Sequence, residues 1–247
     1  KFIYFVGRGV YKYDVYGQSG STITIGNSSW YDPVLAADDC IYAAPLYGDD
    51  GRSILKINPA NNDSVEIIPT GVSFNYAYLT SVLSSDGKEI FFIPRHATQI
   101  LQFNIETKQI QFVGDEFEGR YKWRGGVFHE GFVYAMPHNH NKILKYDPSN
   151  KTTELVGDDL GSDRWKWRGC FVGNDGRIYG IPRSHNRILR FDPRTEKCSF
   201  VGKSFEGNYK WQGCVKDNDG NIFAIPYGHN KVLKITLLGA NELGAVR

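Results

Sequence analysis

The stretch YKWRGGVFHEGFVYAMPHNHNKILKYDP, residues 121–148, decides the fold because the chain nearly repeats it twice. The next copy is WKWRGCFVGNDGRIYGIPRSHNRILRFDP from residue 165, and the one after it is YKWQGCVKDNDGNIFAIPYGHNKVLKI from residue 209. Trp123, Trp167 and Trp211 follow one another at intervals of 44 residues. Self-similarity at a fixed period indicates an array of equivalent structural units.

The repeats extend over the whole chain. Weaker copies end at Val113 and Ile68, and the N-terminal stretch aligns with the second half of a repeat. The chain divides into a partial repeat at about 1–25 and five further repeats at about 26–70, 71–113, 114–156, 157–201 and 202–247. We expect these repeats to form one domain covering residues 1–247.

Each repeat predicts four short strands, named here a to d. In the copy from residue 114, the predicted strands are a at about 121–129, b at 132–136, c at 142–146 and d at 153–156. NDG at 174–176 and at 218–220 is typical of the tight turn of a hairpin. The DP pairs at 147 and 192 mark further turns, because proline cannot continue a ladder. Four strands per unit of about 45 residues, without helices, predict a blade of a β-propeller.

The fold class expected is therefore all-β, a propeller of four-stranded antiparallel blades. Strand a is expected to be innermost, since the glycines of RGG, RGC and QGC permit close backbone approach. The first copy supplies strands b, c and d, whereas the last supplies a, b and c. Six blades are the preferred count, with the tail or further N-terminal residues completing the first blade; the alternatives are five or seven blades.

The repeated polar residues are expected on one face, where the d-to-a and b-to-c connections of a four-stranded meander both emerge. The candidate ligand-binding residues are Lys122, Arg124, Lys166, Arg168, Lys210, Gln212, Arg95, His138, His140, Arg183, His185, Tyr227, His229 and Trp165. Residues 114–247 contain 21 basic and 16 acidic residues, against 8 and 11 in residues 1–113. This bias favours anionic ligands but is far from the basic stripe of a nucleic-acid binder, so no nucleic acid is expected.

Each candidate also has a structural interpretation. The lysines could lie over tryptophan rings and the arginines could bridge blades and stack on aromatic rings. The repeated tryptophans (Trp123, Trp167, Trp211) could be wedges between blades or platforms for sugars, while Trp165 and Trp30 break the pattern and are better candidates for exposed stacking. The histidine-asparagine pairs could cap the b-to-c loops, hold a metal or contact a ligand.

Catalytic residues, a metal site and a cofactor are not predicted. The chain lacks a GxSxG elbow, an HExxH motif and a phosphate-binding loop. An acidic group in the degenerate first half could form a site that breaks the symmetry or could bind a cation; its members are Tyr31, Asp32, Asp38, Asp39, Asp49 and Asp50. The four cysteines lack metal spacing and are expected to be free thiols. No apolar run approaches the roughly 18 residues of a membrane span.

The repeats resemble the Kelch, NHL and YVTN group of β-propeller repeats, in the divergent form YKWxG…DGxIYxIP…NxxLxxDP. The resemblance is strong from residue 114 and weak before it. The chain lacks the glycine pair of Kelch repeats and the Trp-Asp ending of WD40 repeats. The resemblance implies a propeller fold but not a function, because propellers include enzymes, lectins and scaffolds. Related six-bladed lactonases would need acidic metal ligands at the axis, and the sequence shows no such set.

Three functions follow as hypotheses. The first is a non-enzymatic binding or scaffold propeller that engages a protein segment or an acidic polymer, such as an acidic polysaccharide, through one basic-aromatic face. Under this hypothesis, charge reversal at Lys122 and Lys166 is expected to abolish binding without changing the melting temperature. The alternatives are a lectin with several equivalent sugar sites and a lyase or lactonase with an axial pocket. The sequence indicates neither a compartment nor an oligomeric state.

Overall fold

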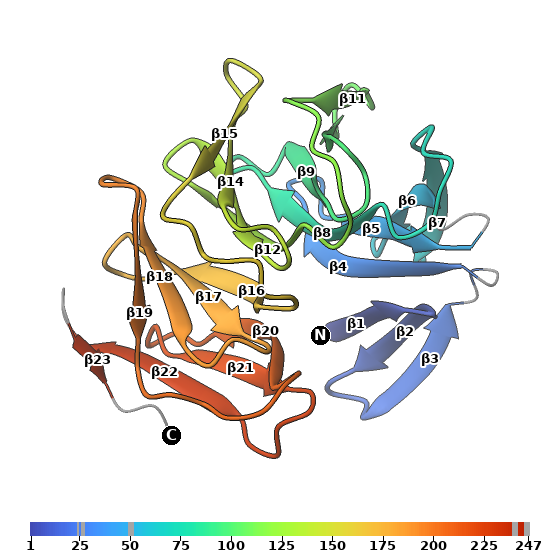
Figure 1. Ribbon diagram of the computed structural model, residues 1–247. Coiled ribbons are helices and arrows are strands. Elements are labelled where there is room, and N and C mark those ends of the chain that lie inside the picture. Colours follow the sequence, from blue (N-terminus) through green and yellow to red (C-terminus); the bar gives the residue numbers. More distant parts are fainter. Residues whose placement is uncertain (24, 26–27, 49–51, 239–241, 245–247) are drawn as a thin grey trace. The chain divides into compact units, whose positions relative to one another are not determined.

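The computed structural model describes residues 1–23, 25, 28–48, 52–238 and 242–244. These residues form six antiparallel sheets, the blades of a β-propeller, as the repeats predict (Figure 1). They make two compact units, Lys1–Glu118 and Gly119–Arg247, with three blades in each. In the part of the chain that is described, no helix is long and apolar enough to cross a membrane.

Unit 1 contains one three-stranded sheet and two four-stranded sheets. Its strands are β1 (Phe2–Gly7), β2 (Gly9–Asp14), β3 (Ser19–Ile23), β4 (Ser29–Leu35), β5 (Ile41–Tyr47), β6 (Ser53–Asn58), β7 (Ser64–Pro69), β8 (Tyr78–Leu83), β9 (Glu89–Pro94), β10 (Ile100–Asn104) and β11 (Ile110–Val113). The sheet orders β1-β2-β3, β4-β5-β6-β7 and β8-β9-β10-β11 are simple meanders.

Unit 2 contains three four-stranded meanders. Its strands are β12 (Trp123–His129), β13 (Phe132–Pro137), β14 (Ile143–Asp147), β15 (Thr152–Val156), β16 (Trp167–Val172), β17 (Ile178–Pro182), β18 (Ile188–Asp192), β19 (Lys197–Val201), β20 (Trp211–Lys216), β21 (Ile222–Pro226), β22 (Leu233–Leu238) and β23 (Glu242–Gly244). Strands a to d of the copy from residue 114 correspond to β12 to β15. The predicted ends differ from the observed ends by at most two residues.

One prediction about the sheets is corrected by the pairing of the tail. The tail or further N-terminal residues were expected to complete the first blade. Instead, β23 pairs antiparallel with β22 and supplies the fourth strand of the last blade. The remaining tail residues, 239–241 and 245–247, lie outside the described residues. The first blade consequently has three strands among the residues that the structure describes.

The inner strands carry a β-bulge that explains their glycines. In β12 the register with β13 shifts between Trp123 and Gly126, so Arg124 and Gly125 fall in the bulge. Gly125 has a φ of +87°, in the left-handed region that favours glycine. A Cβ added to Gly125 would come within 2.6 Å of the Gly169 Cα in the next inner strand. The bulge thus needs glycine both for its backbone angle and for its contact with the next blade.

The repeated tryptophans are wedges between blades. Trp123, Trp167 and Trp211 are at most 2% exposed, and each indole N–H donates to a main-chain carbonyl at 2.9–3.1 Å. Such burial excludes these three rings as sugar platforms. Trp30 was expected to be exposed, but it is fully buried and its indole N–H donates to the Ser53 carbonyl at 2.8 Å. That expectation was wrong because Trp30 pairs with Pro45 just as Trp123 pairs with Pro137, and so occupies the same wedge position.

Candidate functional site

A cluster of cationic and aromatic side chains gathers on unit 2 where the inner strands begin. We call it the arginine–aromatic cluster; its members are Arg124, His138, Trp165, Arg168, Arg183, Tyr209 and Tyr227. Arg124 and Arg168 lie in the bulges of β12 and β16, whereas His138, Arg183 and Tyr227 each follow the proline that ends strand b. Trp165 and Tyr209 precede β16 and β20. All of these residues belong to the same unit.

A path of main-chain hydrogen bonds holds the cluster together. The N–H of Lys166 donates to the carbonyl of His138 at 2.9 Å, and the N–H of Arg183 donates to the carbonyl of Lys166 at 2.9 Å. The path continues from Lys210 N–H to the Arg183 carbonyl at 2.8 Å and from Tyr227 N–H to the Lys210 carbonyl at 2.9 Å. Residues about 45 positions apart are therefore fixed beside one another by the backbone, independently of their side chains.

His138 lies at the centre of the cluster and is fully buried. Its Nδ1 lies 2.7 Å from the carbonyl oxygen of Trp167, which can only accept, so Nδ1 carries the proton. Its Nε2 then accepts a hydrogen bond from Nη1 of Arg183 at 3.2 Å. Burial, and next the charges of Arg124, Arg183 and Arg168, lower the pKa of His138 to about 2. The imidazole is therefore neutral and has three guanidinium groups within electrostatic range.

The fixed neutral state of His138 predicts an acid sensitivity. Its pKa in the folded protein lies below its ordinary value of about 6.5, so only the unfolded chain gains a proton as the pH falls below that value. The contribution of His138 to stability is thus fully present above about pH 6.5 and is lost progressively toward lower pH. We expect His138→Asn, which keeps an N–H near the Trp167 carbonyl, to show a smaller fall in melting temperature between pH 7 and pH 5 than the parent chain. A His138 ring that titrates near pH 6 in an NMR experiment would contradict this assignment.

The guanidinium group of Arg183 is surrounded by aromatic rings. Its Cζ lies 4.7 Å from the ring centroid of Tyr209, 5.1 Å from that of Trp165 and 5.9 Å from that of Tyr227. Cζ of Arg168 also lies 5.9 Å from the Tyr227 ring. These distances suit cation–π contacts. The arginines are 8% exposed, whereas Tyr209 and Tyr227 are 43% and 60% exposed, so the rings frame the cations and reach solvent.

The aromatic residue two positions before each of four inner strands has an unusual backbone conformation. Tyr121, Trp165 and Tyr209 in unit 2 and Tyr76 in unit 1 have φ between +54° and +61°. Bulky side chains rarely adopt this left-handed region, and such strain is often found at functional sites. The N–H of Trp165 is held by Oδ1 of Asn139 at 2.9 Å. Its ring meets Tyr121 edge-on at 4.6 Å and His138 at 5.0 Å.

The role of Tyr121 and Tyr209 was not predicted from the sequence. In the sequence Trp165 stands out as an exception because it is a tryptophan. The structure places it at the same position as the tyrosines, directly before the lysine of each repeat. The signal that could have identified them is an aromatic residue at one fixed place in four successive repeats.

The lysines at the same place are structural. Lys122, Lys166 and Lys210 are at most 2% exposed, and their ammonium groups donate to loop carbonyls rather than to solvent. Nζ of Lys166 donates to the carbonyls of Gly161 and Asp163 at 3.1 and 2.8 Å. Burial lowers the pKa of Lys166 to about 8 and also lowers that of Lys210. Charge reversal at these lysines with an unchanged melting temperature is therefore not expected.

The repeated histidines cap the b-to-c loops, which agrees with their structural interpretation. Nδ1 of His140 accepts the N–H of Lys142 at 3.0 Å, and the ring lies on Trp123 with centroids 4.6 Å apart. His185 and His229 make the same two contacts, with Arg187 and Lys231 and with the next two wedge tryptophans. Burial lowers the pKa of His140 and of His185, which favours the neutral form of both rings.

Two further candidates are not counted among the members of the cluster. Gln212 occupies the bulge of β20 and is half-buried. Arg95 belongs to unit 1, where it follows β9 and its Cζ lies 5.4 Å from the ring of Tyr76. This pair repeats the contact of Arg183 with Trp165. The aromatic–arginine pairing is thus a recurrent feature of the blades.

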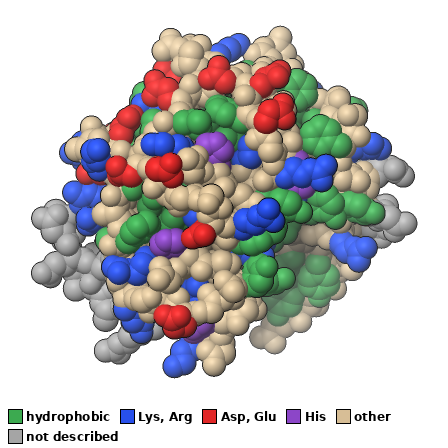
Figure 2. Space-filling view, in the orientation of Figure 1, with side chains coloured by type: hydrophobic (Ala, Val, Ile, Leu, Met, Phe, Trp, Pro, Cys, Tyr) green, Lys and Arg blue, Asp and Glu red, His purple; other side chains and the backbone are tan. Residues whose placement is uncertain are grey.

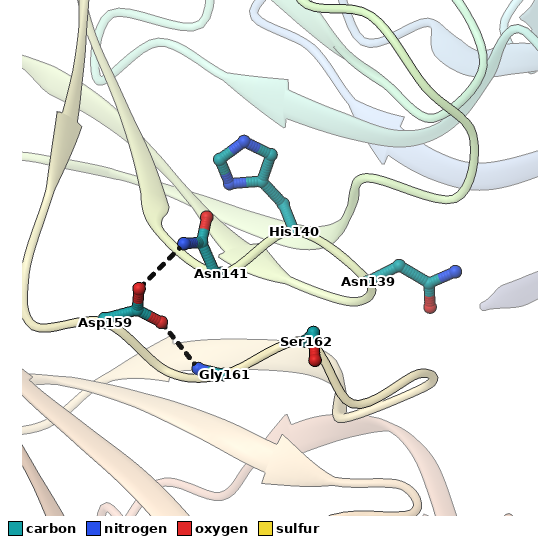
Figure 3. A pocket seen from close by; sticks show the side chains of 6 residues that line it. All are labelled: Asn139, His140, Asn141, Asp159, Gly161 and Ser162. Atoms are coloured by element: carbon teal, nitrogen blue, oxygen red, sulfur yellow. Dashed lines mark hydrogen bonds between the residues drawn. The ribbon is translucent and has the colours of Figure 1, made fainter.

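A polar hollow lies beside the cluster in unit 2. Its volume is about 490 Å³, and it is lined by Asn139, His140, Asn141, Asp159, Gly161 and Ser162. Figure 3 shows the side chains of Asn141 and Asp159 pointing toward each other, with Nδ2 of Asn141 donating to Oδ2 of Asp159 at 3.0 Å. Asn139 connects the hollow with the cluster, since it also holds the N–H of Trp165. The hollow therefore adjoins the aromatic rim.

The acidic residues of the first half do not form a common site in the residues described. Oδ2 of Asp38 accepts from Tyr42 at 2.8 Å and from Lys56 at 3.0 Å, and Oδ2 of Asp32 accepts the N–H of Ser81 at 3.2 Å. Asp49 and Asp50 lie outside the described residues. No three His, Cys, Asp or Glu side chains within the described ranges are arranged to hold a metal ion.

The surface charge is mixed on the face shown in Figure 2, and the cysteines are free thiols as expected. On the face shown in Figure 2, basic side chains lie interspersed with acidic ones rather than in a continuous stripe. All four cysteines are free, and Cys40 is buried. The unusual feature of this chain is consequently not its surface charge but the local gathering of three arginines around His138.

No family model and no curated protein matches the sequence. Solved structures do resemble it in fold. A streptogramin B lyase has a TM-score of 0.79 and 14% identity over 98% of this chain and 78% of that one. A virginiamycin B lyase from Staphylococcus aureus has a TM-score of 0.76 and 11% identity over 94% and 75%. A chain of a nidogen/laminin complex has a TM-score of 0.68 and 13% identity over 99% and 92%. At these identities the likeness shows the fold alone, a six-bladed β-propeller with structural neighbours of the NHL and YVTN-like type.

Proposed function

We propose that this chain is a non-enzymatic binding protein that holds an anionic ligand, an acidic segment of a partner protein, on the arginine–aromatic cluster. The observation that carries the proposal is the placement of Arg124, Arg168 and Arg183 around one neutral, buried imidazole. A bound carboxylate would be attracted by all three guanidinium groups. Guanidinium groups bind carboxylates in a forked geometry, and the exposed rings of Tyr209 and Tyr227 offer apolar contact beside it.

The hydrogen bonds inside the cluster prepare it for binding. His138 is a neutral acceptor for Arg183, so it orients that guanidinium without cancelling its charge. The rings of Trp165 and Tyr209 restrict the same group from two sides. A side chain that is already ordered loses little conformational entropy when a ligand arrives. The nidogen/laminin neighbour shows this fold in a complex between proteins, which is consistent with a protein partner here.

A second candidate ligand is an acidic polysaccharide, and the polar hollow favours it. Amide, imidazole, carboxylate and hydroxyl groups line the hollow, and sugar hydroxyls can donate to and accept from such groups. The partly buried Trp165 stands next to it and offers a ring to the apolar side of a sugar. The wedge tryptophans cannot act in this way because they are buried, so repeated tryptophan platforms do not support a multivalent lectin.

The lyase and lactonase alternative gains less support from the described residues. Two of the similar structures are lyases, but their likeness extends to the fold only. His138 is the imidazole that contacts Arg183, and a pKa of about 2 makes it a poor base at neutral pH. Both of its ring nitrogens are also engaged in hydrogen bonds. We therefore assign this histidine an orienting role.

Calorimetric titration tests the proposal. The probes are a 12-residue peptide of Asp, Glu and Ser, the same peptide with Asn and Gln in place of the acids, and oligosaccharides of uronic acid. We expect the acidic peptide to bind with one site per chain, and the double variant Arg168→Gln/Arg183→Gln to bind it at least tenfold more weakly. The matched control, Arg190→Gln/Arg194→Gln, removes two arginines near the end of β18 and should change the affinity less than twofold.

The titration separates the two ligands. Binding of the uronic-acid oligosaccharide but not of the acidic peptide would replace the protein partner with a polysaccharide. If the chain bound the acidic and the neutral peptide with equal affinity, the proposal of an anionic ligand would be wrong. Because Arg183 contacts His138, the melting temperature of each variant is measured alongside, and the binding of sulfate to the parent chain gives an independent check that needs no substitution.

A further inference from the structure

The three arginines of the arginine–aromatic cluster come from three different places in unit 2. Arg124 lies in the bulge of β12, Arg168 lies in the bulge of β16, and Arg183 follows β17. All three charges act on the ring of His138, so each guanidinium group is within electrostatic range of the same imidazole. Cations that approach one point from different strands suit an anion that offers acceptor oxygens in several directions.

A phosphate monoester matches such an arrangement better than a carboxylate does. It carries a charge of about −1.5 to −2 at pH 7 and has three strong acceptor oxygens. A carboxylate has a single charge and two oxygens. Because electrostatic attraction grows with the charge of the ligand, the three guanidinium groups favour the phosphate. Arginine clusters are also a recurrent means of recognising phosphorylated segments.

The exposed rings at the edge of the cluster select the side chain that carries the phosphate. Arg168 and Arg183 are 8% exposed, whereas Tyr209 and Tyr227 are 43% and 60% exposed. A ligand therefore meets the rings before it reaches the cations. The Tyr227 ring adjoins two of these cations, because Cζ of Arg168 and Cζ of Arg183 both lie 5.9 Å from its centroid. A long side chain with an aromatic ring and a terminal anion fits this order of contacts.

We infer that the cluster binds a phosphotyrosine of the partner segment, with the phosphate on Arg124, Arg168 and Arg183 and the phenyl ring against Tyr209 and Tyr227. This inference rests on the proposed function, since it names the anion that the same site holds. Phosphoserine carries its phosphate closer to the backbone and has no ring, so it should bind more weakly. Sulfotyrosine has the ring but only one charge, and it should also bind more weakly.

The neutral state of His138 allows a test by pH. Its pKa is about 2, so the ring does not change charge between pH 5.5 and pH 7.5, and arginine stays charged over this range. Burial lowers the pKa values of the neighbouring Lys166 and Lys210, and any proton that they gain at lower pH cannot weaken the binding of an anion. The second pKa of a phosphate monoester is about 6, so the fraction of dianion falls about fourfold between pH 7.5 and pH 5.5. The affinity for phosphotyrosine should fall by the same factor.

Calorimetric titration of the full chain tests this inference. The probes are 12-residue acidic peptides that differ only at a central position, which is phosphotyrosine, sulfotyrosine, phosphoserine or glutamate. We expect one site per chain, at least tenfold tighter binding of phosphotyrosine than of glutamate, and at least threefold tighter binding than of the other two. Tyr227→Ala should weaken the binding of phosphotyrosine at least threefold and leave that of phosphoserine unchanged. The matched control is Tyr16→Ala, at a tyrosine of unit 1 that is 79% exposed, and it should change neither affinity.

The outcomes separate this inference from the proposed function. If the phosphotyrosine and glutamate peptides bound equally well at one site, the inference would be wrong and the proposed function would stand. If no acidic peptide bound, whether phosphorylated or not, both would be wrong. Tighter binding of phosphoserine than of phosphotyrosine would contradict the role of the exposed rings. An affinity for phosphotyrosine that did not change between pH 7.5 and pH 5.5 would contradict recognition of the dianion.

Discussion

Gly169→Ala is expected to lower the free energy of unfolding by about 2–5 kcal/mol, because a left-handed backbone costs other residues ~1–2 kcal/mol and overpacking adds ~1–3 kcal/mol. Gly169 has a φ of +86°. Its added Cβ would lie 2.8 Å from the Cα of Gly213, and backbone atoms cannot move aside as a flexible side chain can. The Cα of Gly169 would also lie 2.6 Å from a Cβ added to Gly125. The packing of the inner strands β12, β16 and β20 therefore depends on Gly169. Urea unfolding of the purified chain measures the effect.

Gly161→Ala is the matched control for this prediction. Gly161 has a similar φ of +74°, but no atom lies within 4 Å of its added Cβ. Only the conformational cost of about 1–2 kcal/mol is expected there. The difference between the two variants therefore measures the contact between inner strands. If both variants lost the same stability, the close packing of β16 against β20 would be wrong.

Lys166→Glu is expected to destabilise the chain by about 3–5 kcal/mol, because it would leave a buried charge without compensation. The carboxylate would face the carbonyl oxygens of Gly161 and Asp163, which now accept from Nζ at 3.1 and 2.8 Å. Carboxylate and carbonyl oxygens are all acceptors, so none of the present hydrogen bonds could form. The loop before β16 would lose its anchor, and with it the placement of Trp165 and Arg168.

The control for the lysine is Lys203→Glu. Lys203 is exposed, so the same reversal of charge should change the free energy of unfolding by less than about 0.5 kcal/mol. Thermal and urea unfolding of both variants give the comparison. A Lys166→Glu chain with the stability of the parent would mean that Nζ faces solvent, which would return this lysine to the set of ligand-binding residues.

Periodicity explains why the fold could be predicted from the sequence. Tryptophan, glycine and proline recur at one spacing because each blade needs a wedge, a bulge in its inner strand and an end to strand b. The prediction that Trp30 is exposed was wrong. The degenerate repeat around it has neither the lysine before it nor the glycine after it, so its wedge position was recognisable only from its pairing with Pro45.

The site could be predicted in part. Arginines and the residue after each strand b were expected to share a face, and in unit 2 the backbone path from His138 to Tyr227 brings them together. The lysines could not be placed, because one long side chain can reach either solvent or a loop carbonyl and the sequence does not distinguish these outcomes. Likewise, the left-handed conformation of Tyr121, Trp165 and Tyr209 follows from tertiary contacts rather than from the preference of these residues.

If Arg124, Arg168 and Arg183 together bind an anion, NMR of the arginine Nε–H groups can follow all three at once. The chain is labelled with ¹⁵N-arginine, the signals are assigned by single Arg→Lys variants, and the acidic peptide is titrated in. We expect the signals of these three arginines to shift together and saturate at one peptide per chain, while those of Arg190 and Arg194 stay in place. Shifts confined to exposed arginines, or shifts that never saturate, would contradict it.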